Sequence, residues 1–213
     1  MILTELFNEP LLLLAWVVAV IVVLTIHEFS HALASTLLGD QTAKFSGRLT
    51  LNPLAHVSWI GFLMLVLIGF GWGKPVPFNP YNLKYQRWGP AIVAFAGPFS
   101  NIIMAILGIL AVKLIIFTSL VPETNLMFQF LNLFIVINVI LAIFNLIPLP
   151  PLDGSKILFS IISDIKYAHI RQFMEERGAY LLLILILADN FLHFNILSTL
   201  FFSVINLVYK IFL

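Results

Sequence analysis

Two histidines and a glutamate, His27, Glu28 and His31, form an H-E-x-x-H pattern inside a mostly apolar stretch, residues 11–38. On a helix, residues four apart are separated by about 40° around the axis and about 6 Å along it. Both imidazoles can therefore bind one tetrahedral zinc ion from the same face. Glu28 lies between them, where it can take a proton from a water molecule at the metal. The pattern predicts zinc hydrolase chemistry.

The apolar surroundings of Glu28 require an explanation of their own. A charged side chain at the centre of a membrane-spanning helix costs about 2.5–3.5 kcal/mol to insert. A metal ion in a water-filled cavity would offset that cost. The alternative is a chance pattern at a helix end near the headgroups, where polar residues cost little. Mostly apolar residues on both sides, at 22–24 and 32–38, argue against chance.

The composition is that of an integral membrane protein. Of the 213 residues, 61% are hydrophobic and 10% are charged, whereas soluble domains contain about 25% charged residues. A formal net charge of +1 gives no indication of nucleic-acid binding, and the absence of cysteine excludes disulfides and thiolate metal ligands. We expect one transmembrane domain over 1–213, with a catalytic core at about 10–165 and C-terminal helices at about 166–213.

The hydrophobic runs predict an all-α polytopic membrane protein. Residues 10–38, 91–118 and 126–146 are each long enough to cross about 30 Å of hydrocarbon. After them we expect an amphipathic stretch at 155–177, an apolar region from 178 that is interrupted at 189–190, and a last helix at about 195–212. The first run is too long for a signal peptide and indicates a permanent span.

The region after the first span has a different character. Alternating apolar residues at 40–56 predict one or two short strands. Residues 57–70 are apolar but too few for a full span, which favours a re-entrant segment. Residues 71–90 are rich in proline and glycine and predict irregular backbone. We therefore expect a re-entrant or β-hairpin-like segment after the first span.

The distribution of basic residues predicts a topology. Lys and Arg occur in 40–56, 71–90 and 148–177 and are absent from 1–9, 119–125 and 189–195. The positive-inside rule puts the first three regions in the cytoplasm, provided that 57–70 enters and leaves on one side. We expect a multi-pass protein of the cell membrane whose active site lies toward the cytoplasm.

A catalytic zinc usually has a third protein ligand. The candidates are His56, Glu123, Asp153 and His169. Asp153 follows a proline-rich break that can bend the backbone into a polar cavity. It could equally be the N-cap of the helix that begins near Ser155. The predicted depth of Asp153, close to that of the histidines, favours coordination.

The H-E-x-x-H pattern and four other motifs together resemble a known protein family. The motifs are HEFSH (27–31), GPFSN (97–101), NLIPLPPLDG (145–154), LNPLAH (51–56) and GWGKPVPFNPYNLK (71–84). With these motifs the chain resembles the site-2 protease family of intramembrane zinc metalloproteases, in the small form without a PDZ or CBS domain. The resemblance covers about residues 20–165. It implies a single Zn²⁺ held by His27, His31 and Asp153, with Glu28 as general base and Asn145 near the scissile peptide.

Other polar residues have more than one interpretation. Asn145, Asn101 and His56 are candidates for binding substrate or supporting the ligands. Asn101 could orient the aspartate segment or bond to another helix, and His56 could equally be an interfacial histidine. His169 and His193 are expected to be solvated.

The predicted function is zinc-dependent cleavage of transmembrane segments in single-span membrane proteins within the lipid bilayer. A helical substrate must unwind, and strand edges in 40–56 or 71–90 could hold it extended, unless 71–90 is simply a packed connection. One alternative is a membrane metal or proton transporter that uses the same polar residues as a relay. Another is a catalytically silent adaptor, against which the complete set of catalytic residues argues. The sequence leaves the oligomeric state open.

Overall fold

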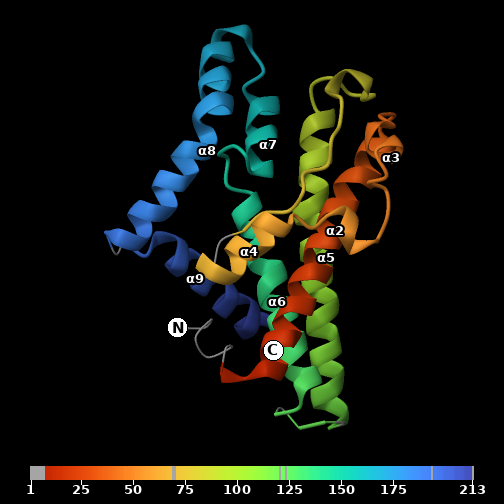
Figure 1. The fold of residues 1–213 in the computed structure, drawn as a ribbon, viewed down its shortest axis with the longest axis vertical. Helices are drawn as coiled ribbons and strands as arrows, with labels where there is room; N and C mark the ends of the chain where they lie inside the picture. Colours follow the sequence, from red (N-terminus) through yellow and green to blue (C-terminus); the bar gives the residue numbers. More distant parts are fainter. Residues whose placement is uncertain (1–7, 69–70, 120, 123, 193, 213) are drawn as a thin grey trace.

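The computed structural model describes residues 8–68, 71–119, 121–122, 124–192 and 194–212, and this part of the chain is predominantly helical. Three helices are long and apolar enough to cross a membrane, by length and composition: α2 (Pro10–Leu37), α5 (Gly89–Thr118) and α6 (Leu126–Asn145). They run side by side through the molecule (Figure 1). The prediction of an all-α polytopic membrane protein is confirmed.

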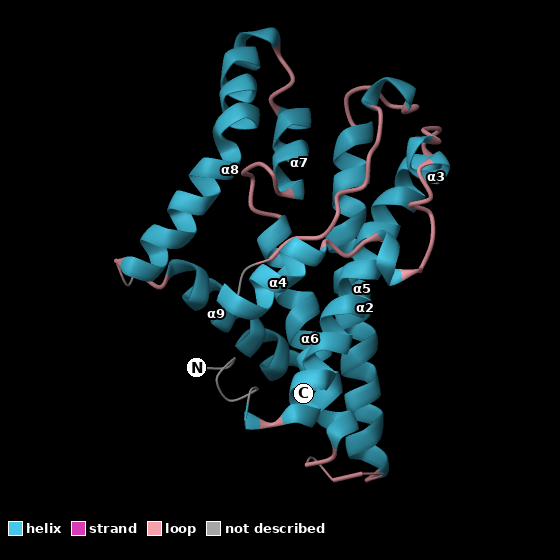
Figure 2. Ribbon diagram, viewed as in Figure 1, coloured by secondary structure: helices cyan, strands magenta, loops and turns pink. Residues whose placement is uncertain are grey.

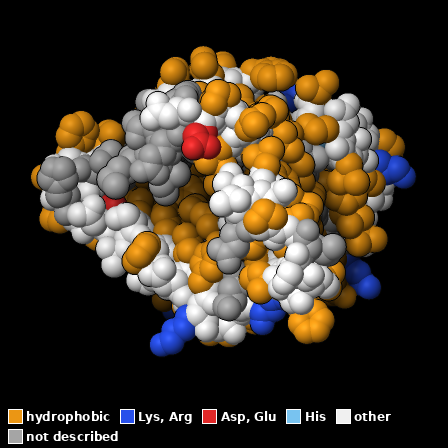
Figure 3. All heavy atoms as spheres, turned by 90° about the horizontal axis from the view of Figure 1, so that it is seen from below, with side chains coloured by type: hydrophobic (Ala, Val, Ile, Leu, Met, Phe, Trp, Pro, Cys, Tyr) orange, Lys and Arg blue, Asp and Glu red, His pale blue; other side chains and the backbone are white. Residues whose placement is uncertain are grey.

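The three long helices pack through small residues and two apolar clusters. One cluster joins α5 and α6 and contains Ala105, Ile109, Val112, Ile135 and Val139. The other joins α2 and α6 through Ala19, Val23 and Phe134. Within a bilayer, small residues let helix backbones approach closely, and van der Waals packing then holds them. Seen from below, the molecule shows mostly hydrophobic side chains and few charged ones (Figure 3).

The prediction of strands at 40–56 is wrong. This segment forms the short helices α3 (Thr42–Phe45) and η1 (Pro53–Ala55), and the described residues contain only an isolated antiparallel bridge between Val57 and Gly73. The Asp40 carboxylate accepts hydrogen bonds from the amide and hydroxyl of Thr42, which begins a helical turn. Asn52 accepts from the Leu54 amide and caps η1. Local side-chain bonds of this kind compete successfully with strand pairing.

The apolar segment after the bridge forms α4 (Trp59–Ile68), with only 10 residues. At 1.5 Å per residue such a helix covers about 15 Å, roughly half of the hydrocarbon thickness. Its length fits a re-entrant segment. The re-entrant prediction for 57–70 stays a prediction, because residues 69–70 lie outside the described part. The loop that follows crosses the helices in front of α2 and α5 (Figure 2) and includes η2 (Pro80–Asn82).

The C-terminal part contains α7 (Asp153–Ile161), η3 (Ile165–Tyr167), α8 (Ala168–Phe191) and α9 (Ile196–Phe212). The break expected at 189–190 comes slightly later, because α8 continues to Phe191. Asp189 accepts hydrogen bonds from the amides of Ile196 and Leu197, so it helps to start α9.

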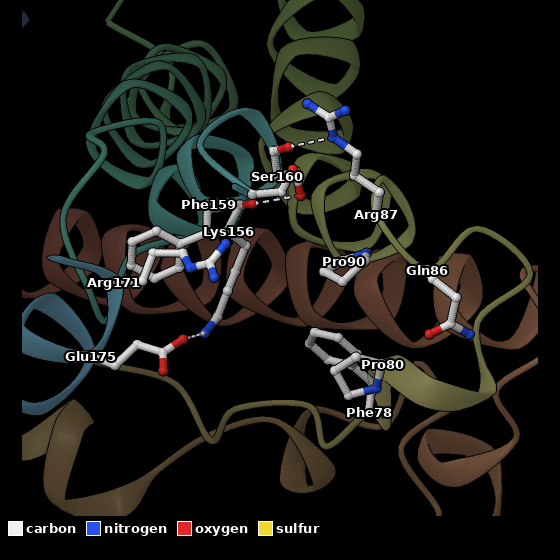
Figure 4. A pocket seen from close by; sticks show the side chains of 11 residues that line it. Phe78, Pro80, Gln86, Arg87, Pro90, Lys156, Phe159, Ser160, Arg171 and Glu175 are labelled. Carbon is white, nitrogen blue, oxygen red and sulfur yellow. Dashed lines mark hydrogen bonds and ion pairs between the residues drawn. The ribbon is translucent and has the colours of Figure 1, made fainter. Parts of the chain in front are cut away.

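A polar cavity of about 300 Å³ lies where α5, α7 and α8 meet (Figure 4). Arg87 Nε donates to the Ser160 carbonyl at 3.1 Å, and Arg171 Nη1 donates to the Ile162 carbonyl at 3.1 Å. Lys156 lies 3.9 Å from the Glu175 carboxylate. Basic side chains at the last carbonyls of a helix stabilise its C-terminus. Arg87, just before α5, and Arg171, on α8, therefore bond to the C-terminal end of α7, while Lys156 pairs α7 with α8.

Candidate metal centre

His27, His31 and Asp153 meet at one point inside the protein. The two Nε2 atoms lie 3.1 Å apart, and each lies 3.3 Å from Asp153 Oδ2. His27 is 4% exposed and His31 is 7% exposed. Among the described residues, these three form the group that could hold a metal ion.

The orientation of the His27 ring follows from a chain of hydrogen bonds across three helices. The Phe134 carbonyl accepts from Asn138 Nδ2 at 2.8 Å, so Asn138 Oδ1 is left to accept from Asn101 Nδ2 at 2.9 Å. Asn101 Oδ1 then accepts from His27 Nδ1 at 2.6 Å. Because a carbonyl ends the chain, each donor is fixed. His27 therefore carries its proton on Nδ1 and presents the Nε2 lone pair to the centre.

His31 and Asp153 complete a set of electron-pair donors. His31 Nδ1 donates to the Val93 carbonyl at 2.7 Å, which leaves its Nε2 lone pair facing inward. Asp153 Oδ2 is buried and has no hydrogen-bond partner. When both imidazoles are neutral, these three atoms present lone pairs to one another and repel unless a cation joins them. Two imidazoles and one carboxylate are a usual ligand set for catalytic zinc, so the residues fit that metal.

The backbone after α6 places Asp153 in this group. A Cβ on Gly154 would lie 2.3 Å from the Leu146 carbonyl, so glycine allows the first turn of α7 to approach the end of α6. Helix α7 begins at Asp153, and its N-cap, Leu152, has no side-chain cap. The Asp153 carboxylate faces the histidines instead of capping α7.

Gly97 on α5 makes room for both imidazoles. A Cβ at this position would lie 2.5 Å from His31 Nε2 and 2.6 Å from His27 Cε1. Real Cβ atoms do not approach other atoms so closely, and both rings are held by hydrogen bonds. The GPFSN motif therefore contributes an empty volume at Gly97 and a hydrogen bond to His27 from Asn101.

Gly97→Ala is expected to weaken zinc binding by at least about tenfold, because the methyl group must displace a ligand ring, and misplaced ligands cost about 10–100-fold in affinity. Competition with a chelator of known affinity measures the effect. Gly108→Ala is the matched control, since its Cβ would meet the Ile135 side chain at 2.8 Å in the apolar core. Equal zinc affinity in the two variants would contradict this account of Gly97.

Glu28 lies between His27 and His31 in the sequence, close enough to His31 for its charge to act there, and is 9% exposed. We call residues 71–76, which cross over it, the strap. Gly73 of the strap lies against the Glu28 carboxylate: a Cβ there would be 3.0 Å from Oε1 and 3.0 Å from Leu24 Cδ1. The proposed general base therefore lies next to both the ligand group and a backbone segment that reaches it only because residue 73 is glycine.

The other candidates lie elsewhere. His56 is fully buried, with Nε2 2.7 Å from the Thr50 carbonyl, and is not in the ligand group. His169 is exposed on α8. Asn145 Nδ2 donates to Leu141 within its own helix. Glu123 and His193 lie outside the described residues. Asn101 bonds to other helices and not to the aspartate segment.

The sequence analysis gave no role to Asn138 and missed its link to His27 through Asn101. It also gave no role to Arg48, which is 4% exposed. For Asn138, the available signal was an asparagine within an apolar helix. For Arg48 the sequence offered no such signal, because loop arginines are common and usually exposed.

Comparisons with known proteins give a family and two relatives. Residues 111–188 match the model of Peptidase family M50. The chain is 38% identical over 175 residues to "Putative zinc metalloprotease YwhC" of Bacillus subtilis (strain 168), which covers 80% of this chain and 78% of that protein. It is 29% identical over 138 residues to "Putative zinc metalloprotease Rip2" of Mycolicibacterium smegmatis, which covers 62% of this chain and 51% of that protein. No solved structure gives a significant match.

Proposed function

The chain belongs to peptidase family M50, and on that premise we propose that His27, His31 and Asp153 bind its zinc ion and that Glu28 is the general base. The enzyme is an intramembrane zinc metalloprotease that acts on membrane proteins. One observation carries the residue assignment. The two histidine Nε2 atoms and the unpartnered Asp153 Oδ2 converge next to Glu28, within the packed apolar helices. No observation favours the transporter or the silent adaptor.

When bound, zinc lowers the pKa of water toward neutrality and polarises the substrate carbonyl. The chain's own residues handle the proton. Glu28 accepts the proton of the attacking water and delivers it to the leaving amine. Asn101 and the Val93 carbonyl hold the two imidazoles in the tautomer that leaves Nε2 free for the metal.

The strap supplies an open backbone edge for an unwound substrate. The Lys74 amide donates to the His56 carbonyl at 2.7 Å, so Val57 and Gly73 form a non-hydrogen-bonded antiparallel pair. In such a pair the amide and carbonyl of each residue point away from the partner strand. Among the described residues, neither group of Gly73 has a hydrogen bond. An extended peptide can therefore pair with Gly73 beside Glu28, which supports the β-addition hypothesis for the strap.

We propose single-span proteins as substrates and a cell-membrane location with the active site toward the cytoplasm. The Lys84 amide donates to the Leu38 carbonyl at 2.8 Å, which ties the start of α5 to the end of α2. This contact supports the topology, because Lys44 in α3 and Lys84 then lie at the same end of α2.

Single cysteines at Lys44 and Lys84 are therefore expected to react from the cytoplasmic side only. The chain has no native thiol, so the signal is free of background. An impermeant maleimide added to intact cells and then to inverted vesicles distinguishes the two sides. Labelling of the two positions from opposite sides would establish 57–70 as a full span.

The function is tested with purified protein and a panel of single-span membrane proteins, with and without a zinc chelator. Fragments that appear only in the absence of chelator, and again after zinc is restored, support the proposal. A loaded protein that cleaves no member of the panel but moves metal across vesicles would favour the transporter.

A further inference from the structure

Arg48 has an unusual environment for an arginine in a loop. It lies between α3 and η1 and is 4% exposed, although the guanidinium remains charged at any physiological pH. Buried charges are ordinarily paired. Yet Arg48 forms no ion pair with any residue that the structure describes. Its Nε is buried without a hydrogen-bond partner among the described residues, which is unfavourable for a charged group.

Among the described residues, the hydrogen-bond partner of the Arg48 guanidinium is the strap. Its Nη2 donates to the carbonyl of Lys74, while the Lys74 amide is bonded to His56. Both backbone groups of Lys74 are thus fixed, one from each side. Gly73 is the preceding residue and lies against Glu28. Arg48 therefore acts on the backbone immediately next to the proposed general base.

The electrostatics agree with this position. Burial lowers the pKa of the Arg48 guanidinium, and the negative charge of the Glu28 carboxylate opposes that shift. The two groups are not close enough for an ion pair, but they are close enough to attract. The Arg48 guanidinium therefore lies within the electrostatic surroundings of the Glu28 carboxylate.

We infer that Arg48 is a positioning residue, which holds the Lys74 carbonyl so that the free amide and carbonyl of Gly73 face an extended substrate beside Glu28. The inference rests on the proposed function, since it concerns the backbone edge that receives the substrate. Arg48 contacts neither the zinc ligands nor the reacting atoms. Its loss should weaken substrate binding and leave the metal in place.

If Arg48 had a purely structural role, its replacement should have the same effects as the replacement of Arg87. Arg87 also donates to backbone carbonyls, those of Ser160 and Ile161, but it is exposed and lies at the far end of α7. It serves as the matched control, because its replacement removes the same kind of bond away from the strap.

The experiment compares Arg48→Gln, Arg48→Lys and Arg87→Gln with the wild-type protein. Three quantities are measured: zinc content, KM and kcat on the single-span protein that the wild type cleaves best, and hydrogen exchange at the Lys74 amide. For Arg48→Gln we expect full zinc, a KM raised at least tenfold with kcat changed less than threefold, and faster exchange at Lys74. A rise in KM at constant kcat indicates lost substrate binding. For Arg48→Lys we expect KM and Lys74 exchange between those of Arg48→Gln and the wild type. Arg87→Gln should have the wild-type values of all three quantities.

Zinc loss in Arg48→Gln, or wild-type KM and wild-type exchange, overturns the inference. If Arg48→Gln does not fold, the Arg48→Lys variant tests the inference. Faster exchange at the Lys74 amide together with a KM raised at least threefold supports the inference. A wild-type value of either quantity overturns it. If the wild type cleaves no substrate, the proposed function fails. The zinc and exchange measurements still test whether Arg48 holds the strap.

Discussion

Glu28→Gln is expected to leave zinc bound and to reduce cleavage by about 10²–10⁴-fold, the range that general acid–base catalysis contributes. Glutamine has nearly the same shape but cannot accept the proton of water. Glu28 is not in the ligand group, so the two histidines and Asp153 should keep their affinity for the metal. Elemental analysis of the purified variant and a cleavage assay on the same sample measure the two effects.

Glu175→Gln is the control for the loss of one carboxylate. Glu175 is exposed on α8, pairs with Lys156 at 3.9 Å and is not in the group that could hold a metal ion. It should keep both zinc and activity, since exposed ion pairs contribute little. A Glu28→Gln protein that cleaves at near the wild-type rate would remove Glu28 from the mechanism.

Asp153→Asn should weaken zinc binding by more than about 100-fold, the upper limit for losing a supporting hydrogen bond, because here an anionic ligand itself is lost. Cleavage should disappear with the metal. Chelator competition measures the affinity, and excess zinc should restore little activity. Asparagine is as good a helix cap as aspartate, so a capping role for Asp153 predicts almost no effect.

Asp164 offers a direct comparison with that alternative. Its carboxylate accepts from the Lys166 amide and caps η3, while the residue is exposed. Asp164→Asn should therefore preserve zinc and activity. Similar zinc affinity in the Asp153 and Asp164 variants would mean that another residue supplies the third ligand.

The helix periodicity explains why part of the candidate site could be predicted. His27 and His31 share a face because they are four residues apart, and that relation holds on any α-helix. Asp153 needed a further argument about depth, since it lies 122 positions after His31 in the sequence. The long apolar runs likewise predicted α2, α5 and α6.

Contacts between segments far apart in the sequence could not be predicted from helix periodicity or apolar runs. Whether Asn138 reaches Asn101 depends on how α5 and α6 rotate about their axes, which packing decides. The strands at 40–56 failed because alternation is a weak signal beside local capping by Asp40 and Asn52. Arg48 could not be assigned, because the carbonyl that it binds lies 26 residues away.

The hydrogen bonds from Asn138 through Asn101 to His27 also limit how the enzyme can open. They connect α6, α5 and α2, and Asn101 and Asn138 are fully buried. Separating α5 from α6 to admit a substrate would break the Asn101–Asn138 bond, which fixes the amide that holds the ring of His27, a proposed metal ligand. Gate motions that keep these bonds therefore move the three helices together. Any lateral entrance is left to the periphery, where the strap, α4 and the α8–α9 pair can shift without touching that chain of bonds.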